Sequence, residues 1–182
     1  MQLQTINYGQ FEGTQREWRF EGLSLGDVNL LVGRNASGKT RALNVIHGLA
    51  RLLSGGKLQY ASGDYDVVFV DGDSTARYRL HYEGSVVKHE AFEINGRQLL
   101  VRSDGGAGKI YAEKEQRKLD FQTPDDEIAA VARRDSIQHP FFEPLHLWAR
   151  SARHWAFGSS LGKDVLPVHE GTLAARCLGV AL

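Results

Sequence analysis

The chain has 182 residues, with 22 lysines and arginines against 22 aspartates and glutamates, and 42% of its residues are hydrophobic. These values are typical of a folded domain and exclude a disordered or collagen-like chain. Zero formal net charge gives no electrostatic support for nucleic-acid binding, which stays open because a local basic stripe is compatible with a balanced total. The sequence has no signal-peptide pattern and no apolar run of about 18 residues, so we expect a cytoplasmic protein with no membrane partner.

The first third of the chain predicts two strands, a buried strand and a helix. Apolar and polar residues alternate over residues 3–8, and more loosely over 18–25, as in half-buried strands. Residues 28–32, Val-Asn-Leu-Leu-Val, form a nearly continuous apolar run typical of a central parallel strand covered on both faces. After Lys39 the apolar residues recur at helical spacing until Gly55 and Gly56, where we expect the helix to end.

The middle of the chain predicts an antiparallel meander, and the last third predicts helices. Short strand-like runs separated by turn formers occupy residues 66–70, 76–82, 86–94 and 97–101. After residue 111 the pattern becomes helical, with a helix start at Thr123, where a capping hydroxyl precedes Pro124. A second helix is expected after Pro140, and a weaker one from Thr172 to the C-terminus.

The strongest motif is Gly-Arg-Asn-Ala-Ser-Gly-Lys-Thr, which fits the phosphate-loop pattern G-x-x-x-x-G-K-[ST] at every constrained position. Glycines let the backbone wrap an anion, and the loop amides and the following helix start supply a positive field. In this pattern the lysine reaches the terminal phosphates of ATP and the threonine ligates Mg²⁺. The predicted nucleotide-binding residues are Gly33, Arg34, Asn35, Ala36, Ser37, Gly38, Lys39, Thr40 and Arg41, with Thr40 as the metal ligand.

The segments NLLVGRNASGKT and TRALNVIHGLARLL, with the later ARYRLHYEG, VVKHEAFEING and PFFEPLHLWARSARHWAF, resemble the N-terminal lobe of ABC-type ATPases of the SMC, RecF and OLD branch, often called AAA-family ATPases. The resemblance implies an α/β fold: a P-loop NTPase core, as in the N-terminal part of an ABC-like head, with an antiparallel β lobe and C-terminal helices. It implies a single ATP-binding domain over 1–182, divided into strands, loop and helix (1–56), a meander (57–112) and a mainly helical part (113–182). It also implies ATP and Mg²⁺ as cofactors and Lys39 as the catalytic residue that stabilises charge during hydrolysis.

Two ATP molecules lie between two heads in this family, so the resemblance implies a homodimer or a partner protein. The family also has a signature helix and an apolar strand ending in Asp-Glu, and neither appears after Trp155. Residues 53–57 look like a signature, but we interpret them as the end of the helix that follows the phosphate loop. Asp71 ends an apolar run, but no Glu follows it, so we interpret this run as a strand entering an Asp-Gly turn.

Three further residues precede the predicted central strand, at positions where ABC-like proteins often bring side chains near the nucleotide. For Phe11, Arg16 and Trp18 we expect plain core and surface roles, with a role near the base or phosphates as the alternative. We expect the histidines to be structural or surface residues, because none has the spacing of a metal site. The single cysteine, Cys177, excludes an internal disulfide.

The sequence therefore predicts an ATP-binding domain of an ABC/SMC-like ATPase, in which hydrolysis requires downstream motifs that this chain does not show. The alternative is a self-contained nucleotide-sensing module, or a small P-loop phosphotransferase that uses Asp71.

Overall fold

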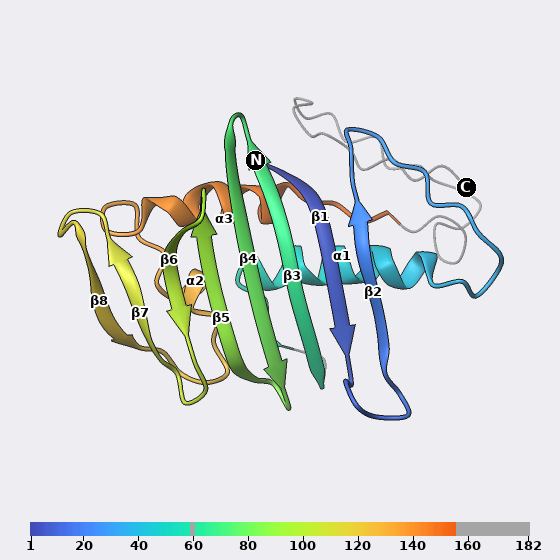
Figure 1. The fold of residues 1–182 in the computed structure, drawn as a ribbon, viewed down its shortest axis with the longest axis horizontal. Helices are drawn as coiled ribbons and strands as arrows, with labels where there is room; N and C mark the ends of the chain where they lie inside the picture. The colour runs from blue at the N-terminus through green and yellow to red at the C-terminus, as the bar shows by residue number, and fades with distance from the viewer. Residues whose placement is uncertain (59–60, 156–182) are drawn as a thin grey trace, which may run out of the picture.

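The computed structural model describes residues 1–58 and 61–155, and these are built around one sheet of eight strands (Figure 1). The strand order is β2-β1-β3-β4-β5-β6-β7-β8, and every neighbouring pair is antiparallel. From β3 onward each strand pairs with the next along the chain, as in a meander. The strands are β1 (Gln2–Gln10), β2 (Trp18–Ser24), β3 (Ser62–Asp71), β4 (Ser74–Glu83), β5 (Val86–Ile94), β6 (Arg97–Arg102), β7 (Ala107–Ala112) and β8 (Arg117–Gln122).

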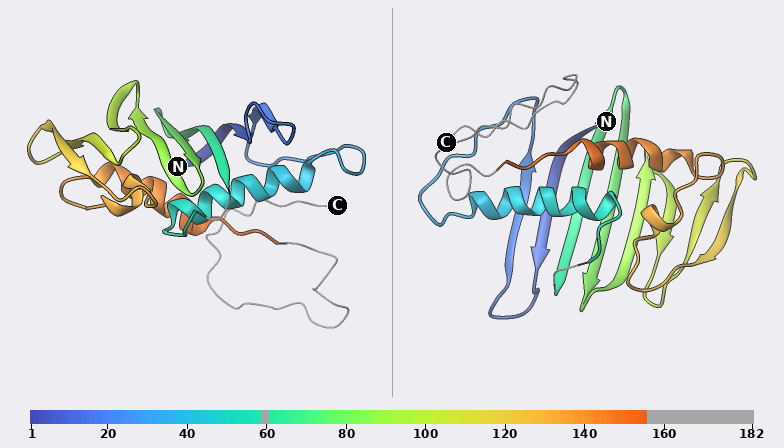
Figure 2. Two further views of the ribbon diagram at one scale, coloured as in Figure 1. Left: turned by 90° about the horizontal axis from the view of Figure 1, so that it is seen from below. Right: turned by 180° about the vertical axis from the view of Figure 1, so that it is seen from behind.

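The helices all lie on one face of this sheet, as the edge-on view in Figure 2 shows. They are α1 (Lys39–Leu53), α2 (Ala129–Ala132), the 3-10 helix η1 (Pro140–Phe142) and α3 (Glu143–Ser151). Helices α1 and α3 lie side by side across the strands, and α2 lies under β5 and β6 (Figure 2). The molecule therefore has two layers, with the core between the sheet and the helices.

Period-two alternation along the central strands separates the core from the outer face of the sheet. On β3, Val67 and Phe69 are fully buried, and the Phe69 ring packs against Trp148 of α3 with ring centroids 4.7 Å apart. The intervening Asp66 lies on the other face, where its carboxylate accepts hydrogen bonds from Arg77 of β4 at 2.7 and 2.5 Å. One face of the sheet is thus apolar and covered by helices, and the opposite face carries charged pairs.

Several predicted elements are confirmed. The alternating runs at 3–8 and 18–25 form β1 and β2, and the four runs of the meander form β3 to β6. Helix α1 has the predicted bounds, and Gly55 follows it with φ 105°, a left-handed conformation that favours glycine at a helix end. Asp71 pairs with Ser74 across the β3–β4 turn, which confirms its interpretation as part of a hairpin.

The predicted α/β fold, with a parallel P-loop core, is wrong, because the described sheet is antiparallel throughout. Residues 28–32, predicted as the central parallel strand, belong to no strand, and Val28, Leu30 and Val32 are 86, 66 and 79% exposed. An apolar run indicates that its side chains favour burial, but it does not indicate whether the chain supplies the neighbouring strands of a parallel sheet. Within residues 1–58 and 61–155 no element supplies those strands.

The meander is longer than predicted, because β7 ends the part predicted as a meander and β8 lies in the part predicted as mainly helical, which begins at residue 113. Two more strands, β7 and β8, follow a turn in which Gly105 and Gly106 have φ of 79° and 77°. Helix α2 has only four residues, and its N-cap is Ile128 and not Thr123. The Thr123 hydroxyl instead accepts a hydrogen bond from Arg133 Nε at 3.2 Å. The helix predicted from Thr172 lies outside the described residues.

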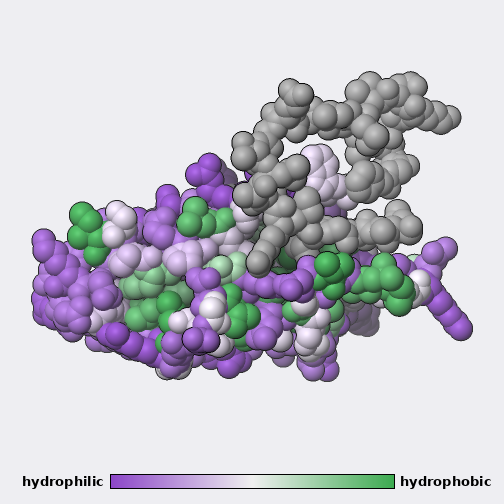
Figure 3. Space-filling model, turned by 90° about the horizontal axis from the view of Figure 1, so that it is seen from above, coloured by the Kyte–Doolittle hydropathy of each residue, from purple (hydrophilic) through white to green (hydrophobic). Residues whose placement is uncertain are grey.

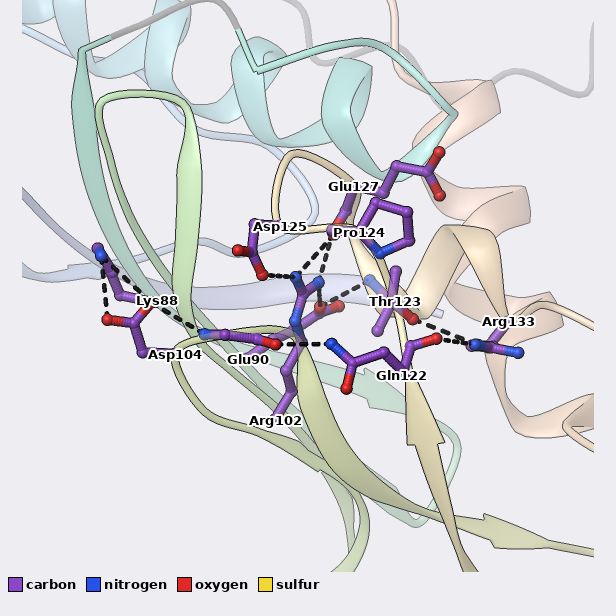
Figure 4. Close-up of polar contacts among 12 residues, drawn as sticks. Lys88, Glu90, Arg102, Asp104, Gln122, Thr123, Pro124, Asp125, Glu127 and Arg133 are labelled. Atoms are coloured by element: carbon purple, nitrogen blue, oxygen red, sulfur yellow. Dashed lines mark hydrogen bonds and ion pairs between the residues drawn. The ribbon is translucent and has the colours of Figure 1, made fainter.

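A buried carboxylate on β5 holds the start of α2 (Figure 4). Glu90 is 0% exposed and accepts hydrogen bonds from the amides of Ala129 and Ala130 at 2.7 and 2.8 Å, and from the Tyr78 hydroxyl at 3.0 Å. Burial is the largest influence on its pKa and raises it, while these hydrogen bonds and the Arg102 charge act in the opposite direction. Glu90 thus does from the sheet what a capping side chain does within a helix.

Among the described residues, no helix is both long enough and apolar enough to cross a membrane.

Candidate phosphate-binding site

The predicted phosphate loop occupies residues 33–40 and leads directly into α1, at the end of the molecule that carries β2 (Figure 1). A hydrogen bond from the Ser37 amide to the Arg34 carbonyl, at 3.2 Å, closes a turn within the loop. Ala36 and Gly38 have φ of 63° and 92°, so the backbone passes twice through the left-handed region before the helix begins. The loop therefore curls back on itself.

The Lys39 ammonium group lies inside this curled loop. Its Nζ atom donates hydrogen bonds to the carbonyl oxygens of Gly33 at 2.7 Å and Arg34 at 2.8 Å, and lies 3.4 Å from Ser37 Oγ. A Cβ atom at Gly33 would lie 2.8 Å from Ser37 Oγ, so a side chain there would require the Ser37 hydroxyl to move. The loop thus holds the Lys39 ammonium group at the point where its backbone turns.

The start of α1 is open to an anion. No side chain caps this helix start, and its first turn contains no acidic residue. The first amides of any helix lack an acceptor within the helix, and the aligned peptide dipoles place partial positive charge at this end. The Lys39 charge and the uncapped helix start therefore favour an anion at the same place.

The remaining predicted residues divide into two groups. Arg34, Asn35 and Thr40 are exposed in or beside the loop, and of these three only the Arg34 carbonyl is hydrogen-bonded to Lys39 in the described structure. Arg41 instead turns away, because its Nη2 donates to Gln10 Oε1 at 2.8 Å and its guanidinium lies 4.0 Å from the centre of the Trp18 ring. A cation over the face of a tryptophan is an attractive arrangement.

Trp18 is a neighbour of the loop that the sequence motif does not include. A Cβ atom at Gly38 would lie 3.7 Å from Trp18 Cζ2. The ring also packs near Tyr8 and Phe20, with centroids 5.9 and 5.4 Å away. Trp18 is thus partly buried among aromatic residues, as expected. Through its contacts with Gly38 and Arg41 it also lies against the start of α1, which only the tertiary structure reveals.

At this loop we expect one protein ligand for Mg²⁺, the exposed hydroxyl of Thr40. Mg²⁺ binds through oxygen atoms and usually keeps several waters, with substrate phosphates supplying the rest. In the described part of the chain, no group of three or more His, Cys, Asp or Glu side chains is arranged to hold a metal ion. The donor set therefore fits Mg²⁺ that arrives with a phosphate ligand, and it does not fit a resident metal.

Asp71 takes no part in this site. Its Oδ1 atom accepts a hydrogen bond from the N-terminal ammonium group at 2.8 Å. Lys39 forms no ion pair with any described carboxylate, and its hydrogen bonds go to residues 33, 34 and 37. The loop thus has a cation for phosphate and, in the described residues, no carboxylate placed to activate water.

A cavity of about 380 Å³ lies outside this loop, by the β1–β2 hairpin and the neighbouring strands β3 and β4. Burial, the largest influence, raises the pKa of Asp64 on its wall. The acidic character of the lining disfavours a phosphate ligand there. The acidic residues that line it are Glu12, Glu17, Glu21, Asp64, Asp66 and Glu83.

No protein-family model matches this sequence, and comparison with curated proteins and with solved structures found no significant match.

Proposed function

We propose that this chain binds the phosphate groups of a nucleoside triphosphate, in the form of Mg-ATP, at residues 33–40. The observation that carries the proposal is the position of the Lys39 ammonium group, 2.7 and 2.8 Å from two loop carbonyls at an uncapped helix start. On binding, the β- and γ-phosphate oxygens replace these carbonyls as acceptors for Lys39. The loop amides bind the same phosphates, and Thr40 contributes a hydroxyl to Mg²⁺.

Hydrolysis is a separate part of the proposal. Attack by water on the γ-phosphate needs a group that orients the water as well as charge stabilisation by lysine, amides and Mg²⁺. Lys39 is the residue in this chain proposed to stabilise the developing charge. We propose that the water-orienting carboxylate comes from sequence outside this chain, as in the SMC, RecF and OLD branch of ATPases, whose loop sequence this chain resembles. Because ATP is a cytoplasmic metabolite, the cytoplasm is the proposed compartment.

The alternatives are a nucleotide-sensing module that does not hydrolyse ATP and a phosphotransferase that uses Asp71. The sensing module makes the same use of residues 33–40 and differs only in turnover. The Asp71 carboxylate is engaged with the N-terminal ammonium group at 2.8 Å, which gives the phosphotransferase no support.

The partner that we propose is a second polypeptide that packs on residues 28–32, just before the loop. Val28, Leu30 and Val32 expose 86, 66 and 79% of their surface, and Figure 3 shows apolar surface, in green, at this end of the molecule. The backbone groups of Val28, Leu30 and Val32 make no hydrogen bond to another described residue. Exposed apolar side chains next to free backbone donors and acceptors favour addition of a strand. A second copy is the first candidate, because the zero net charge opposes self-association only weakly.

Titration of fluorescently labelled ATP, with Mg²⁺, into the full chain and into Lys39→Ala tests the proposed ligand. We expect affinity to fall at least about tenfold, because charge-assisted hydrogen bonds to phosphate contribute about 1.5–3 kcal/mol. Lys114→Ala is the matched control, because it removes an exposed lysine from the β7–β8 turn. Circular dichroism checks that each variant folds. Competition by tripolyphosphate but not by adenosine locates the recognition at the phosphates, and equal affinities of the wild type and Lys39→Ala contradict the proposal.

A further inference from the structure

Helices α1 and α3 lie side by side in the helical layer of the molecule (Figure 2). A second cluster of basic side chains lies between them. The two helices flank an open surface cavity of about 330 Å³, lined by His47, Arg51 and Ser54 from α1 and its end, and by Arg150 and Arg153 from α3 and its end. Alanines 50, 149 and 152 complete the wall. The lining thus contains three guanidinium groups, an imidazole and a hydroxyl, and no carboxylate.

These arginines differ from two arginines of β4, which have acidic partners. Arg77 and Arg79 pair with Asp66 and Glu93 on the outer face of the sheet. In contrast, none of Arg51, Arg150 and Arg153 lies within ion-pair distance of a carboxylate in residues 1–58 and 61–155. Within the described part of the chain, Arg153 Nη1 donates to the carbonyl oxygens of Arg150 and Ala152, at 2.6 and 3.0 Å. The described residues therefore supply no carboxylate to compensate the charge around the cavity.

One donor of this group is buried without an acceptor. Arg51 Nη2 is inaccessible to water and has no hydrogen-bond partner among the described residues. The stem of the same side chain packs on Gly56, where an added Cβ would lie 2.9 Å from Arg51 Cγ. Because this buried donor has no acceptor among the described residues, an anion that reaches it would supply one.

The pKa of His47 is affected by burial and by the same positive charges. Burial lowers the pKa of His47, and the nearby His154 and Arg51 lower it further. The His47 and His154 rings lie 5.2 Å apart between centroids. An added positive charge is thus disfavoured here, whereas a negative charge is favoured.

We propose that the cavity between α1 and α3 binds a phosphate group, with Arg51 as its principal ligand. Guanidinium groups present paired donors that match the oxygens of phosphate, and the cavity holds three of them. This site is independent of the loop at residues 33–40, because Arg51 follows Lys39 by twelve residues of helix, or about 18 Å. The phosphate comes either from a small phosphate ligand or from the backbone of a nucleic acid.

The test uses the full chain carrying Lys39→Ala, so that the loop does not contribute to phosphate binding. Inorganic phosphate is titrated into this protein and into the same protein carrying Arg51→Met, which keeps an unbranched stem against Gly56. We expect at least about a tenfold loss of affinity on removing this guanidinium. The His47 ring, followed by NMR, should show a raised pKa when phosphate binds, because an anion favours the imidazolium.

A second variant keeps the proposal testable if Arg51→Met does not fold. Arg150→Gln removes an exposed cation, and we expect a smaller loss of phosphate affinity, of about threefold. Undiminished phosphate binding in whichever of these variants folds overturns the proposal. So does a wild-type cavity that leaves the His47 pKa unchanged at saturating phosphate.

A short single-stranded oligonucleotide without terminal phosphates distinguishes the two sources. Binding that weakens steeply with salt and is lost in Arg51→Met identifies the nucleic-acid backbone. Inorganic phosphate binding without oligonucleotide binding identifies a small phosphate ligand. Oligonucleotide binding that Arg51→Met does not change, together with no phosphate binding, overturns the proposal.

Discussion

Glu90 of β5 and Arg102 of β6 are both fully buried, with Arg102 Nη1 and Glu90 Oε2 3.8 Å apart (Figure 4). Arg102 also donates to the carbonyl of Pro124 at 2.8 Å and to that of Glu127. Glu90 accepts from the first amides of α2. The pair therefore fastens the segment after β8 to the centre of the sheet.

Glu90→Ala is expected to lower the free energy of unfolding by about 3 kcal/mol. It leaves Arg102 without its buried acidic neighbour and leaves two buried amides of α2 without a hydrogen-bond acceptor. Urea denaturation measures this change. Glu93→Ala is the matched control on the same strand, because Glu93 is partly exposed and pairs with Arg79; it should cost less than about 1 kcal/mol. Equal losses in the two variants would show that burial of the Glu90 pair has no special role.

The stability of the protein should also depend on pH through Glu90. Burial raises the pKa of Glu90 in the folded state, so over the range between its unfolded pKa, about 4.3, and that raised value the folded state binds more protons. The contribution of Glu90 is then complete below pH 4.3 and is lost as the pH rises through the folded pKa. Unfolding free energies of the wild type minus those of Glu90→Gln should fall as the pH increases from 4. A difference that rises with pH contradicts the direction of this shift.

ATP turnover by the isolated chain should not exceed that of Lys39→Ala. Lys39 forms no ion pair with a described carboxylate, and Asp71 is paired with the N-terminus at 2.8 Å, so among the described residues we identify no carboxylate that would orient the attacking water. Phosphate release measured for the wild type, Lys39→Ala and Asp71→Asn tests this. Turnover that disappears in Asp71→Asn would favour the phosphotransferase alternative.

Replacing Leu30 and Val32 by serine should reduce association without unfolding the chain, because both side chains are largely exposed, at 66 and 79%. Sedimentation of the wild type and the double variant, with and without Mg-ATP, measures the effect. Association in both conditions fits strand addition at residues 28–32, and association only with nucleotide fits two loops covering each other's ATP. A wild-type monomer in every condition contradicts the proposed self-association and leaves a different polypeptide as the partner to seek.

Local sequence patterns were sufficient for those parts of the protein that local physics controls. The alternation in residues 86–94 predicts β5 because neighbouring side chains of a strand point to opposite faces. The spacing of apolar residues after Lys39 and the glycines at 55 and 56 predict both ends of α1. The motif at residues 33–40 likewise located the loop that encloses the Lys39 ammonium group.

Only the tertiary structure decided how these elements combine. Residues 28–32 have the composition of a central strand, yet strand pairing needs a neighbour, and the described chain places none beside them. The amide hydrogen-bond donors at the start of α2 are satisfied by Glu90, which lies 39 residues before Ala129 in the chain. No local sequence pattern predicts this contact. Two further arrangements likewise depend on tertiary packing: the contact between Trp18 and Arg41, and the placement of Arg51 near Arg150 and Arg153. A sequence determines what each segment can bury or bond locally, whereas contacts between distant segments depend on the packing of the whole chain.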